Sequence, residues 1–378
     1  MFDLTEEQQL IQETAAKFAA TRLIPNASAW DQQEDIPRAV FDELAELGFM
    51  GVPTPDTYGG SGLGNFELVL ILEEINRGCA STGVTLSVHN SLVQGPLYKF
   101  GADALKKKYL PKLTNAAWIG AYCLTEPQAG SDAANQHTTA VKDGDHYVLN
   151  GSKIWITNGA WADLFIVFAR TDKTQRTKGI SCFIVERGFP GFSVGKKEKK
   201  MGIRGSSTTV VNFDNCRVPA VNMLGEEGRG FNIAMDTLNG GRIGIATQSV
   251  GIARAALELS VKHAKERVTF GKPIADYQAI QWKLADMAMN IDAARLLVYR
   301  AATLRDRGAN MAKEAAMAKL FASEICNRAV QEGVQIHGGY GYTKDYTIER
   351  LFRDARITEI YEGTSEIQRI VIAKHLLG

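Results

Sequence analysis

The spacing of hydrophobic residues changes twice along the 378-residue chain. From Thr5 onward, apolar side chains recur with the period of an α-helix. The string Thr5-x-x-Gln8 is typical of a capping box, in which two side chains satisfy each other's backbone at a helix start. Turn-rich segments between residues 53 and 62 separate this region from a second helical block at 66–77 and 103–113. The first part of the chain is therefore predicted to be helical.

Beyond Trp118 the pattern becomes that of short β-strands. Asp143-Gly144 lies between two strand-like runs, which is typical of a hairpin with a type I′ turn, and Asn150-Gly151 repeats the signal. Apolar runs that indicate buried strands occupy residues 164–168, 180–185 and 208–213. Short strands linked by hairpins favour an antiparallel sheet or barrel over a parallel sheet.

After Gly230 the helical period returns and persists nearly to the end of the chain. One apolar stripe follows a long predicted helix and consists of Ile280, Leu284, Met287, Ile291, Ala294 and Val298. Residues 311–330 are alanine-rich and also helical, and such stripes are typical of a bundle core. We therefore predict an α+β fold with an N-terminal helical domain (1–117), a middle antiparallel β domain (118–227) and a C-terminal four-helix bundle (228–378).

Composition and charge exclude several classes of protein. The net charge of 43 − 42 = +1 gives no global attraction to nucleic acid or to an anionic membrane, and no apolar stretch is long enough to span a bilayer. The lysines at 196–200 are expected to form a solvated turn between strands. Five cysteines without a C-x-x-C pair or a nearby histidine cluster indicate a reducing compartment and no metal site.

Several common catalytic motifs are absent from the sequence. It contains no G-x-G-x-x-G dinucleotide fingerprint, no G-x-x-x-x-G-K-[ST] phosphate loop and no G-x-S-x-G nucleophile elbow. A redox reaction on this scaffold would therefore need another way of binding its cofactor.

The segment Ile360–Gln368 is the strongest chemical candidate. Ser365 and Gln368 form a second possible capping box, which would place Glu362 on a loop just before a helix. An arbitrary glutamate is usually a surface residue, but the string Tyr361-Glu362-Gly363-Thr364-Ser365-Glu366-Ile367-Gln368 resembles the catalytic segment of the acyl-CoA dehydrogenase family. In that family the first glutamate of the string is the base.

Further segments resemble the same family and occur in family order over essentially the whole chain. They are Tyr122–Pro127 with Ala129–Asp132, Lys153–Asn158, Glu266–Pro273 with Gln278, and Gln335–Tyr342. The hydroxyls of Thr125 and Thr157 suit the polar edge of a flavin ring, and Arg267 suits bidentate binding of a diphosphate. His337 is assigned no chemistry.

The resemblance implies a set of site residues and one cofactor, FAD. It implies that Glu362 is the catalytic base. The implied flavin contacts are Tyr122, Leu124, Thr125, Ser131, Trp155, Ile156, Thr157, Arg267, Phe270, Gln278, Gln335, Gly338, Gly339, Thr364 and Glu366. The implied substrate contacts are Ser131, Leu238, Asn239, Arg242, Glu362 and Gly363.

The resemblance also implies an assembly. In the family, the residues matching Arg267, Gln278 and 335–339 reach a flavin bound mainly to a neighbouring subunit. A homotetramer built as two dimers is therefore expected.

The implied reaction is α,β-dehydrogenation of a short acyl-CoA to the trans-2-enoyl-CoA, with electrons passed to an electron-transfer flavoprotein. Some relatives carry the base at the position of Gly241, which has no side chain to serve. Asn239–Arg242 resembles members that act on α-methyl-branched groups such as isobutyryl-CoA, whereas 201–206 resembles butyryl-type members, so linear and branched substrates both stay open. Gln128 replaces a glycine of many relatives, and contact with CoA and exposure to solvent both stay open for it.

Alternative hypotheses are an acyl-CoA oxidase or another flavoenzyme of the same fold, such as a desulfinating or nitroalkane-type enzyme, and a flavin-free scaffold. The opening sequence resembles neither a secretory signal nor a transit peptide, so a cytoplasmic location is expected. A mitochondrial matrix protein whose transit peptide has been removed is the open alternative. Pathway, physiological electron acceptor and direction in the cell stay open.

Overall fold

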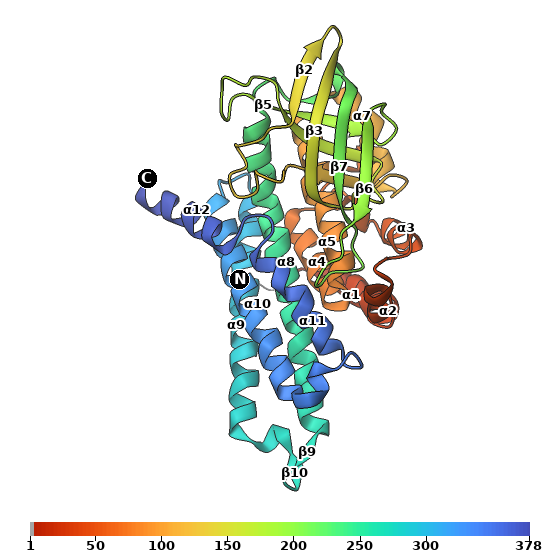
Figure 1. The fold of residues 1–378 in the computed structure, drawn as a ribbon. Helices are drawn as coiled ribbons and strands as arrows, with labels where there is room; N and C mark the ends of the chain where they lie inside the picture. The colour runs from red at the N-terminus through yellow and green to blue at the C-terminus, as the bar shows by residue number, and fades with distance from the viewer. Residues whose placement is uncertain (1–3) are drawn as a thin grey trace.

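A computed structural model of the chain describes residues 4–378 and confirms the predicted helical, β, helical order (Figure 1). The first helical region comprises α1 (Glu6–Phe18), η1 (Ala19–Leu23), α2 (Ala27–Gln33), α3 (Ala39–Glu46), α4 (Asn65–Gly78), α5 (Ala80–Ser87), η4 (Val88–Gln94), α6 (Gly95–Phe100) and α7 (Asp103–Thr114). The predicted capping box of α1 is confirmed, because the Gln8 amide N–H donates to the Thr5 hydroxyl and the Thr5 N–H donates to the Gln8 side chain.

The middle region is a sheet with the strand order β6-β7-β3-β2-β4-β5-β8, and β1 lies beside β4. The strands are β1 (Gly120–Cys123), β2 (Thr139–Asp143), β3 (His146–Thr157), β4 (Leu164–Arg170), β5 (Ile180–Glu186), β6 (Phe192–Lys197), β7 (Thr208–Pro219) and β8 (Met223–Leu224). Most pairs are antiparallel as predicted, but β4 runs parallel to both β1 and β2. Alternate residues of β4 enter two different cores, because successive side chains of a strand point to opposite faces.

Two turn predictions in this region are wrong in detail. The β2–β3 turn has Gly144 and Asp145 at its centre, and only Gly144 has a positive φ (60°), whereas a type I′ turn needs a positive φ at both. Asn150-Gly151 forms no turn and lies inside β3, where the pairing with β7 shifts register between Leu149 and Gly151. Pairing with a third strand therefore overrides the local Asn-Gly signal, and the glycine accommodates a bulge instead.

The lysine-rich segment at 196–200 is only partly the solvated turn that was predicted. Lys197 ends β6 and pairs with Asp35. Lys200 donates a 2.7 Å hydrogen bond to the carbonyl of Ser206, and burial lowers its pKa to about 8. The Lys200 end of the segment packs against the protein because the Lys200 ammonium has a backbone carbonyl as its acceptor.

The C-terminal region is the predicted helical bundle. Its elements are α8 (Gly230–Glu266), α9 (Gln278–Asp306), α10 (Ala312–His337), η7 (Gly338–Tyr342), α11 (Thr347–Arg356), η8 (Ile357–Glu359) and α12 (Ser365–Leu377). Met287, Ile291, Ala294 and Val298 of the predicted stripe are buried, whereas Ile280 and Leu284 are only partly buried. The hairpin of β9 (Val268–Thr269) and β10 (Lys272–Pro273) lies at the far end of the bundle (Figure 1).

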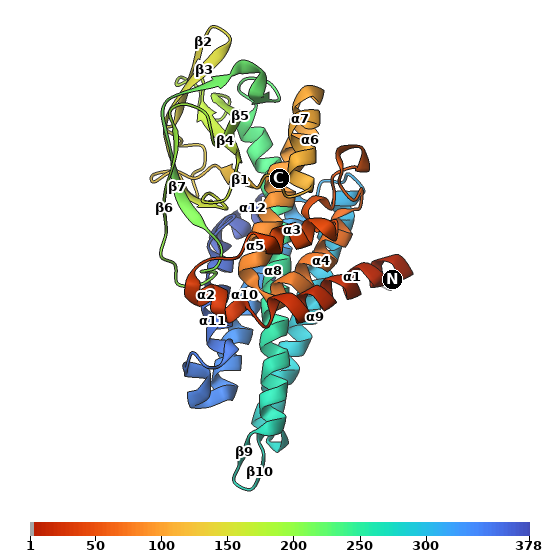
Figure 2. The same cartoon turned by 90° about the vertical axis from the view of Figure 1, so that its right-hand side faces the viewer.

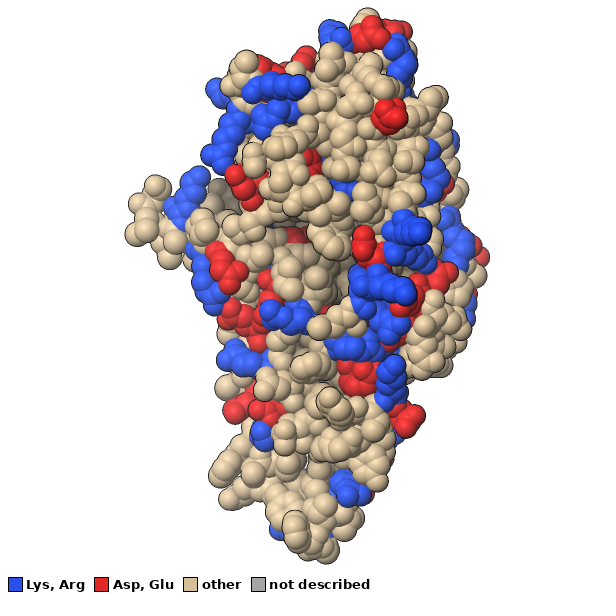
Figure 3. Space-filling view, viewed as in Figure 1, with Lys and Arg blue, Asp and Glu red and all other residues tan. Residues whose placement is uncertain are grey.

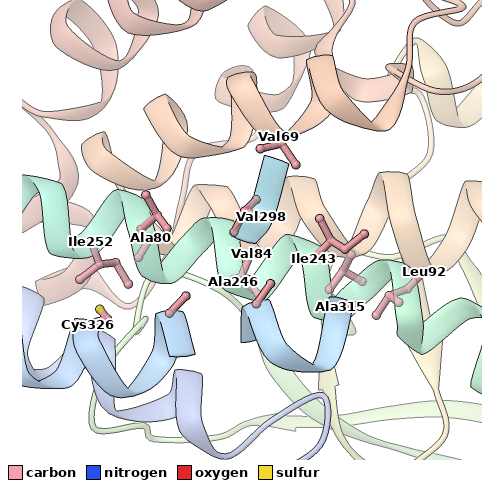
Figure 4. Packing of buried hydrophobic residues seen from close by; sticks show 14 of the residues in the cluster. Val69, Ala80, Val84, Leu92, Ile243, Ala246, Ile252, Val298, Ala315 and Cys326 are labelled. Atoms are coloured by element: carbon pink, nitrogen blue, oxygen red, sulfur yellow. The ribbon is translucent and has the colours of Figure 1, made fainter. Parts of the chain in front are cut away.

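Helix α8 is the central element of the molecule. It packs against α4, α5, α9 and α10, and its upper end is flanked by the sheet and by α6 (Figures 1 and 2). Figure 4 shows apolar side chains from α4, α5, η4 and α10, such as Val84 and Ala315, converging on Ile243 and Ala246 of α8. Residues of α8 around Ile243 and Ala246 are therefore held rigidly between the helical layers. None of the helices in residues 4–378 is long and apolar enough for a membrane span.

Candidate functional site

The loop that carries Glu362 has an unusual backbone. Glu362 is left-handed with φ 51°, and Gly363 follows it with φ 95°. The Thr364 hydroxyl caps α12 by accepting the Ile367 N–H, so the prediction that Ser365 and Gln368 form a capping box is wrong. Adjacent threonine and serine are both good caps, and the chain uses the first of them. The side chain of Gln368 donates instead to the carbonyl of Gly363 at 2.8 Å and so fixes the loop.

One carboxylate oxygen of Glu362 is buried without a hydrogen-bond donor, while the residue as a whole is half-buried. Its Oε2 atom has no partner within residues 4–378, and burial raises its pKa to about 7, against the opposing effect of Lys319 and Arg242. A Cβ atom added to Gly241 would lie only 2.0 Å from this oxygen. The carboxylate therefore rests directly on the glycine face of α8, and a carboxylate with such a pKa is suited to proton abstraction near neutral pH.

The predicted substrate contacts on α8 gather around the same carboxylate. Arg242 is 6% exposed, faces the charge of Glu362 and donates a 2.7 Å hydrogen bond to the side chain of Asn239. Leu238 is partly buried against the helical core. The hydroxyl of Tyr361 donates to the side chain of Gln248, which follows Arg242 further along α8. The residue before Glu362 is thus joined to the helix.

A second group of predicted residues lies on the sheet. Trp155 sits in a register shift of β3 between Lys153 and Ile156, has φ 60° and leaves 60% of its surface exposed. The Ile154 N–H donates to the carbonyl of Thr125 at 2.9 Å, so the two predicted flavin segments are adjacent. Tyr122 and Leu124 are buried on the helix-facing side of the sheet. An exposed aromatic ring on a strand that also carries Thr157 and adjoins Thr125 fits a flat, polar-edged isoalloxazine ring.

The surface of the molecule is hollowed between the β region and the helices (Figure 3). Figure 3 shows a hollow between the β region and the helical bundle, with acidic atoms visible inside it. In the same view of the ribbon, the sheet and the segment between α11 and α12 lie on opposite sides of this hollow (Figure 1). No group of histidine, cysteine, aspartate and glutamate side chains in residues 4–378 could hold a metal ion.

A buried ion pair that the sequence analysis missed holds the sheet side of the site. Lys153 is fully buried and donates to Glu126 at 2.7 Å, and Glu126 also accepts the N–H groups of His137 and Thr138. Although burial alone would raise it, Lys153 and these donors hold the pKa of Glu126 below its usual value. Both residues belong to segments that resemble the family: Glu126 follows Thr125, and Lys153 precedes Ile154. The sequence around each residue gave no sign that the two would pair across 27 positions.

Removal of the Lys153 ammonium is expected to lower both the stability of the protein and its flavin content. Lys153→Met should lower the free energy of unfolding by about 3–5 kcal/mol, because it leaves the carboxylate of Glu126 buried and uncompensated. The protein should also lose flavin, since Thr125 adjoins Glu126. Thermal melting and the ratio of absorbance at 450 to 280 nm check this. The double variant Lys153→Met/Glu126→Gln should recover part of the stability, and a single variant with normal melting and full colour would contradict the expectation.

The pair also binds Gln128. Its side-chain amide donates to Glu126 at 2.8 Å, while the residue as a whole is exposed to solvent. Ser131 is exposed further along the same loop, and the neighbouring Asp132 pairs with Arg176 at 2.9 Å. The loop is therefore tethered at both ends while Ser131 stays accessible.

The remaining predicted flavin contacts lie elsewhere in the chain. Arg267 and Phe270 belong to the β9–β10 hairpin, at the opposite end of the bundle from the sheet (Figure 1). The guanidinium of Arg267 lies over the ring of Tyr340 at 5.4 Å, which brings the hairpin next to the Gly338–Gly339 turn. Phe270 is 98% exposed. One chain therefore does not bring these residues to Glu362, as expected if they serve a neighbouring copy.

Comparison with known proteins places this geometry in context. Models of the N-terminal, middle and C-terminal domains of acyl-CoA dehydrogenases match residues 5–117, 121–216 and 228–377. An acyl-CoA dehydrogenase of Bacillus subtilis (strain 168) is 52% identical to this chain over 99% of both proteins. A short-chain specific acyl-CoA dehydrogenase of Clostridium acetobutylicum is 49% identical over 98% of both. The structure of butyryl-CoA dehydrogenase from Megasphaera elsdenii is 48% identical, with a TM-score of 0.98 over 100% of both chains.

Proposed function

The chain belongs to the acyl-CoA dehydrogenase family, and from that premise we propose that it removes two hydrogens from Cα and Cβ of a short acyl-CoA to give the trans-2-enoyl-CoA. The observation that carries the proposal is the buried Oε2 atom of Glu362, which has no hydrogen-bond donor and lies against Gly241. A carboxylate in this setting has no structural hydrogen bond to lose when it accepts a proton. It is therefore free to serve as a base.

The proposed roles of the protein groups follow from their positions. Glu362 takes the Cα proton, which becomes more acidic as the thioester carbonyl oxygen accepts a hydrogen bond. The N–H of Glu362 is assigned that bond by the family resemblance. Arg242 keeps positive charge beside the carboxylate before the proton arrives. When bound, FAD supplies the acceptor for the hydride that leaves Cβ.

The flavin contacts are proposed to come from two copies of the chain. Thr125, Trp155 and Thr157 would hold the isoalloxazine ring, with Thr364 and Glu366 at the start of α12. Arg267, Phe270, Gln278 and the 335–339 segment would hold the diphosphate and adenosine of the flavin of the next copy. The exposed hairpin at the far end of the bundle supports this division, which requires at least a dimer and agrees with a homotetramer.

The proposed substrate is a short acyl group, linear or α-methyl-branched. The names of the similar proteins, short-chain specific and butyryl-CoA dehydrogenase, support a short chain. The side chain of Leu92 would lie 2.8 Å from a Cβ on Gly241, so it borders the space next to Glu362. We further propose that electrons pass to an electron-transfer flavoprotein and that the protein works in the cytoplasm.

The proposal is tested by visible spectra of the purified protein under anaerobic conditions, before and after addition of butyryl-CoA or isobutyryl-CoA. A yellow protein that one thioester bleaches supports the dehydrogenase reaction and identifies the acyl group. A colourless protein that takes up no added FAD would overturn it. Oxygen consumption during turnover would assign the protein to the oxidases of this fold.

A further inference from the structure

Lys319 of α10 is a buried cation that the proposed reaction does not yet use. Its side chain is 0% exposed, and its ammonium makes one hydrogen bond within residues 4–378, a 2.7 Å contact to the carbonyl of Gly363. An ammonium has three donors, and a buried charge without an opposite charge is costly. Lys153, the other fully buried lysine, has a carboxylate in direct contact. Lys319 has none, and burial lowers its pKa to about 8, so the groups that favour its charge lie at longer range.

The charged groups that face Lys319 identify the balancing group. They are Glu362, Glu359, Glu366 and Arg242. Glu359 is paired with Arg356, and Glu366 is exposed to solvent, which screens its charge. Arg242 is itself a cation. Glu362 is therefore the one acidic group among these that has a buried oxygen without a hydrogen-bond partner.

The hydrogen bond of Lys319 also holds the backbone next to Glu362 in place. The carbonyl of Gly363 accepts both from Lys319 and from the Gln368 side chain. This carbonyl belongs to the residue directly after Glu362, in a pair of residues with left-handed φ angles. A non-glycine residue in that region is strained, and it persists only where its surroundings hold it. Lys319 thus bonds to the loop whose backbone orients the carboxylate.

We propose that Lys319 is a positioning residue for Glu362: its ammonium anchors the Gly363 carbonyl and supplies the positive charge that keeps the adjoining carboxylate ionised. The inference rests on the proposed role of Glu362 as base. It adds a residue from a different helix, 43 positions away in sequence, to the machinery that sets the protonation state of that base.

The consequence of losing this charge has a definite sign. A nearby positive charge favours the ionised form of a carboxylate, so its removal raises the pKa of Glu362 further above about 7. At pH 7 a smaller fraction of the free protein would then hold the carboxylate needed to take a proton. The deficit should shrink as the pH rises, because a higher pH ionises the carboxylate without help from the ammonium.

The test is an infrared pH titration of the purified holoenzyme without substrate. The protonated-carboxyl band that the Glu362→Gln variant lacks is followed in the wild type, Lys319→Met and Lys319→Gln. We expect a wild-type midpoint near 7 and a shift of about one pH unit or more upward in both variants. Lys319→Gln keeps a donor for the Gly363 carbonyl but no charge, so it separates anchoring from electrostatics. An unchanged midpoint in Lys319→Gln would overturn the proposal.

A matched control and a second readout complete the experiment. Lys313 lies on the same helix and is partly exposed beside Glu314, so Lys313→Met should leave the midpoint unchanged. The acid limb of kcat/KM for flavin reduction should move with the infrared midpoint, and raising the pH should restore the rate of Lys319→Gln. A shifted band in a protein that no short acyl-CoA bleaches would refute the proposed function alone. Normal bleaching with an unshifted band would refute the role of Lys319 alone.

Discussion

Glu362→Gln is expected to give a folded, yellow protein whose flavin is reduced by butyryl-CoA or isobutyryl-CoA about 10⁴-fold more slowly than in the wild type. The amide has nearly the same shape as the carboxylate but cannot accept the Cα proton. Binding of the thioester should survive, because the change leaves the backbone N–H and the walls of the site in place. Stopped-flow measurement of the loss of absorbance at 450 nm under anaerobic conditions gives the rate. A variant that reduces its flavin at the wild-type rate would remove Glu362 from the role of base.

The same variant has a stability signature that checks for misfolding. The pKa of Glu362 is raised from its ordinary 4.5 to about 7 in the folded chain. A carboxyl group with a raised folded-state pKa opposes folding where the unfolded chain is ionised, so its cost grows from about pH 4.5 to pH 7 and then stays constant. Glu362→Gln should therefore melt at a higher temperature than the wild type above pH 7, and the gain should fade toward pH 4.5. A lower melting temperature across this range would show that the loss of activity is structural.

Gly241→Ala is expected to lower the rate of flavin reduction by about 10²-fold while leaving the flavin bound. The new methyl group would lie 2.0 Å from Oε2 of Glu362, a distance that neither atom can tolerate. The carboxylate must move, and small displacements of a catalytic group are costly in rate. The backbone of α8 is helical here, so alanine itself introduces no local strain. The rate is measured as for Glu362→Gln.

Gly240→Ala provides the matched control on the same helix. Its methyl group would meet the guanidinium of Arg305, the far end of a flexible side chain, and not Glu362. This variant should keep most of its activity, since Arg305 can move aside. Equal losses of activity in the two variants would show that this part of α8 tolerates no added volume. The effect of Gly241→Ala could then not be attributed to the contact between Gly241 and Glu362.

The sequence predicts elements well where the signal is local. Thr5 and Gln8 satisfy each other within one helical turn, so the pattern alone identifies the first helix. The runs in β4 and β5 are apolar on both faces and could be assigned as buried strands. Asn150-Gly151 shows the limit of such reasoning, because its position inside β3 depends on pairing with β7, more than 50 residues later.

The candidate site divides in the same way. Glu362 is recognisable from its own string, but the sequence does not show its left-handed backbone or its contact with Gly241. Lys153 and Lys319 could not be assigned, because a lysine in a helix or strand usually reaches solvent and only the packed fold reveals otherwise. Their partners, Glu126 and Gly363, are 27 and 44 positions away. Burial that depends on contacts between residues far apart in the sequence cannot be read from the sequence alone.

The remote hairpin with Arg267 and Phe270 has a genetic consequence. In the proposed assembly, a chain with a damaged hairpin keeps its own Glu362 but impairs the flavin of its neighbour, whereas a chain without Glu362 keeps a working hairpin to offer. When two such defective chains assemble together, some of the sites formed contain both intact halves. Two alleles that are each inactive alone would then complement one another in the same cell, and a single hairpin allele would harm the wild-type chains with which it assembles.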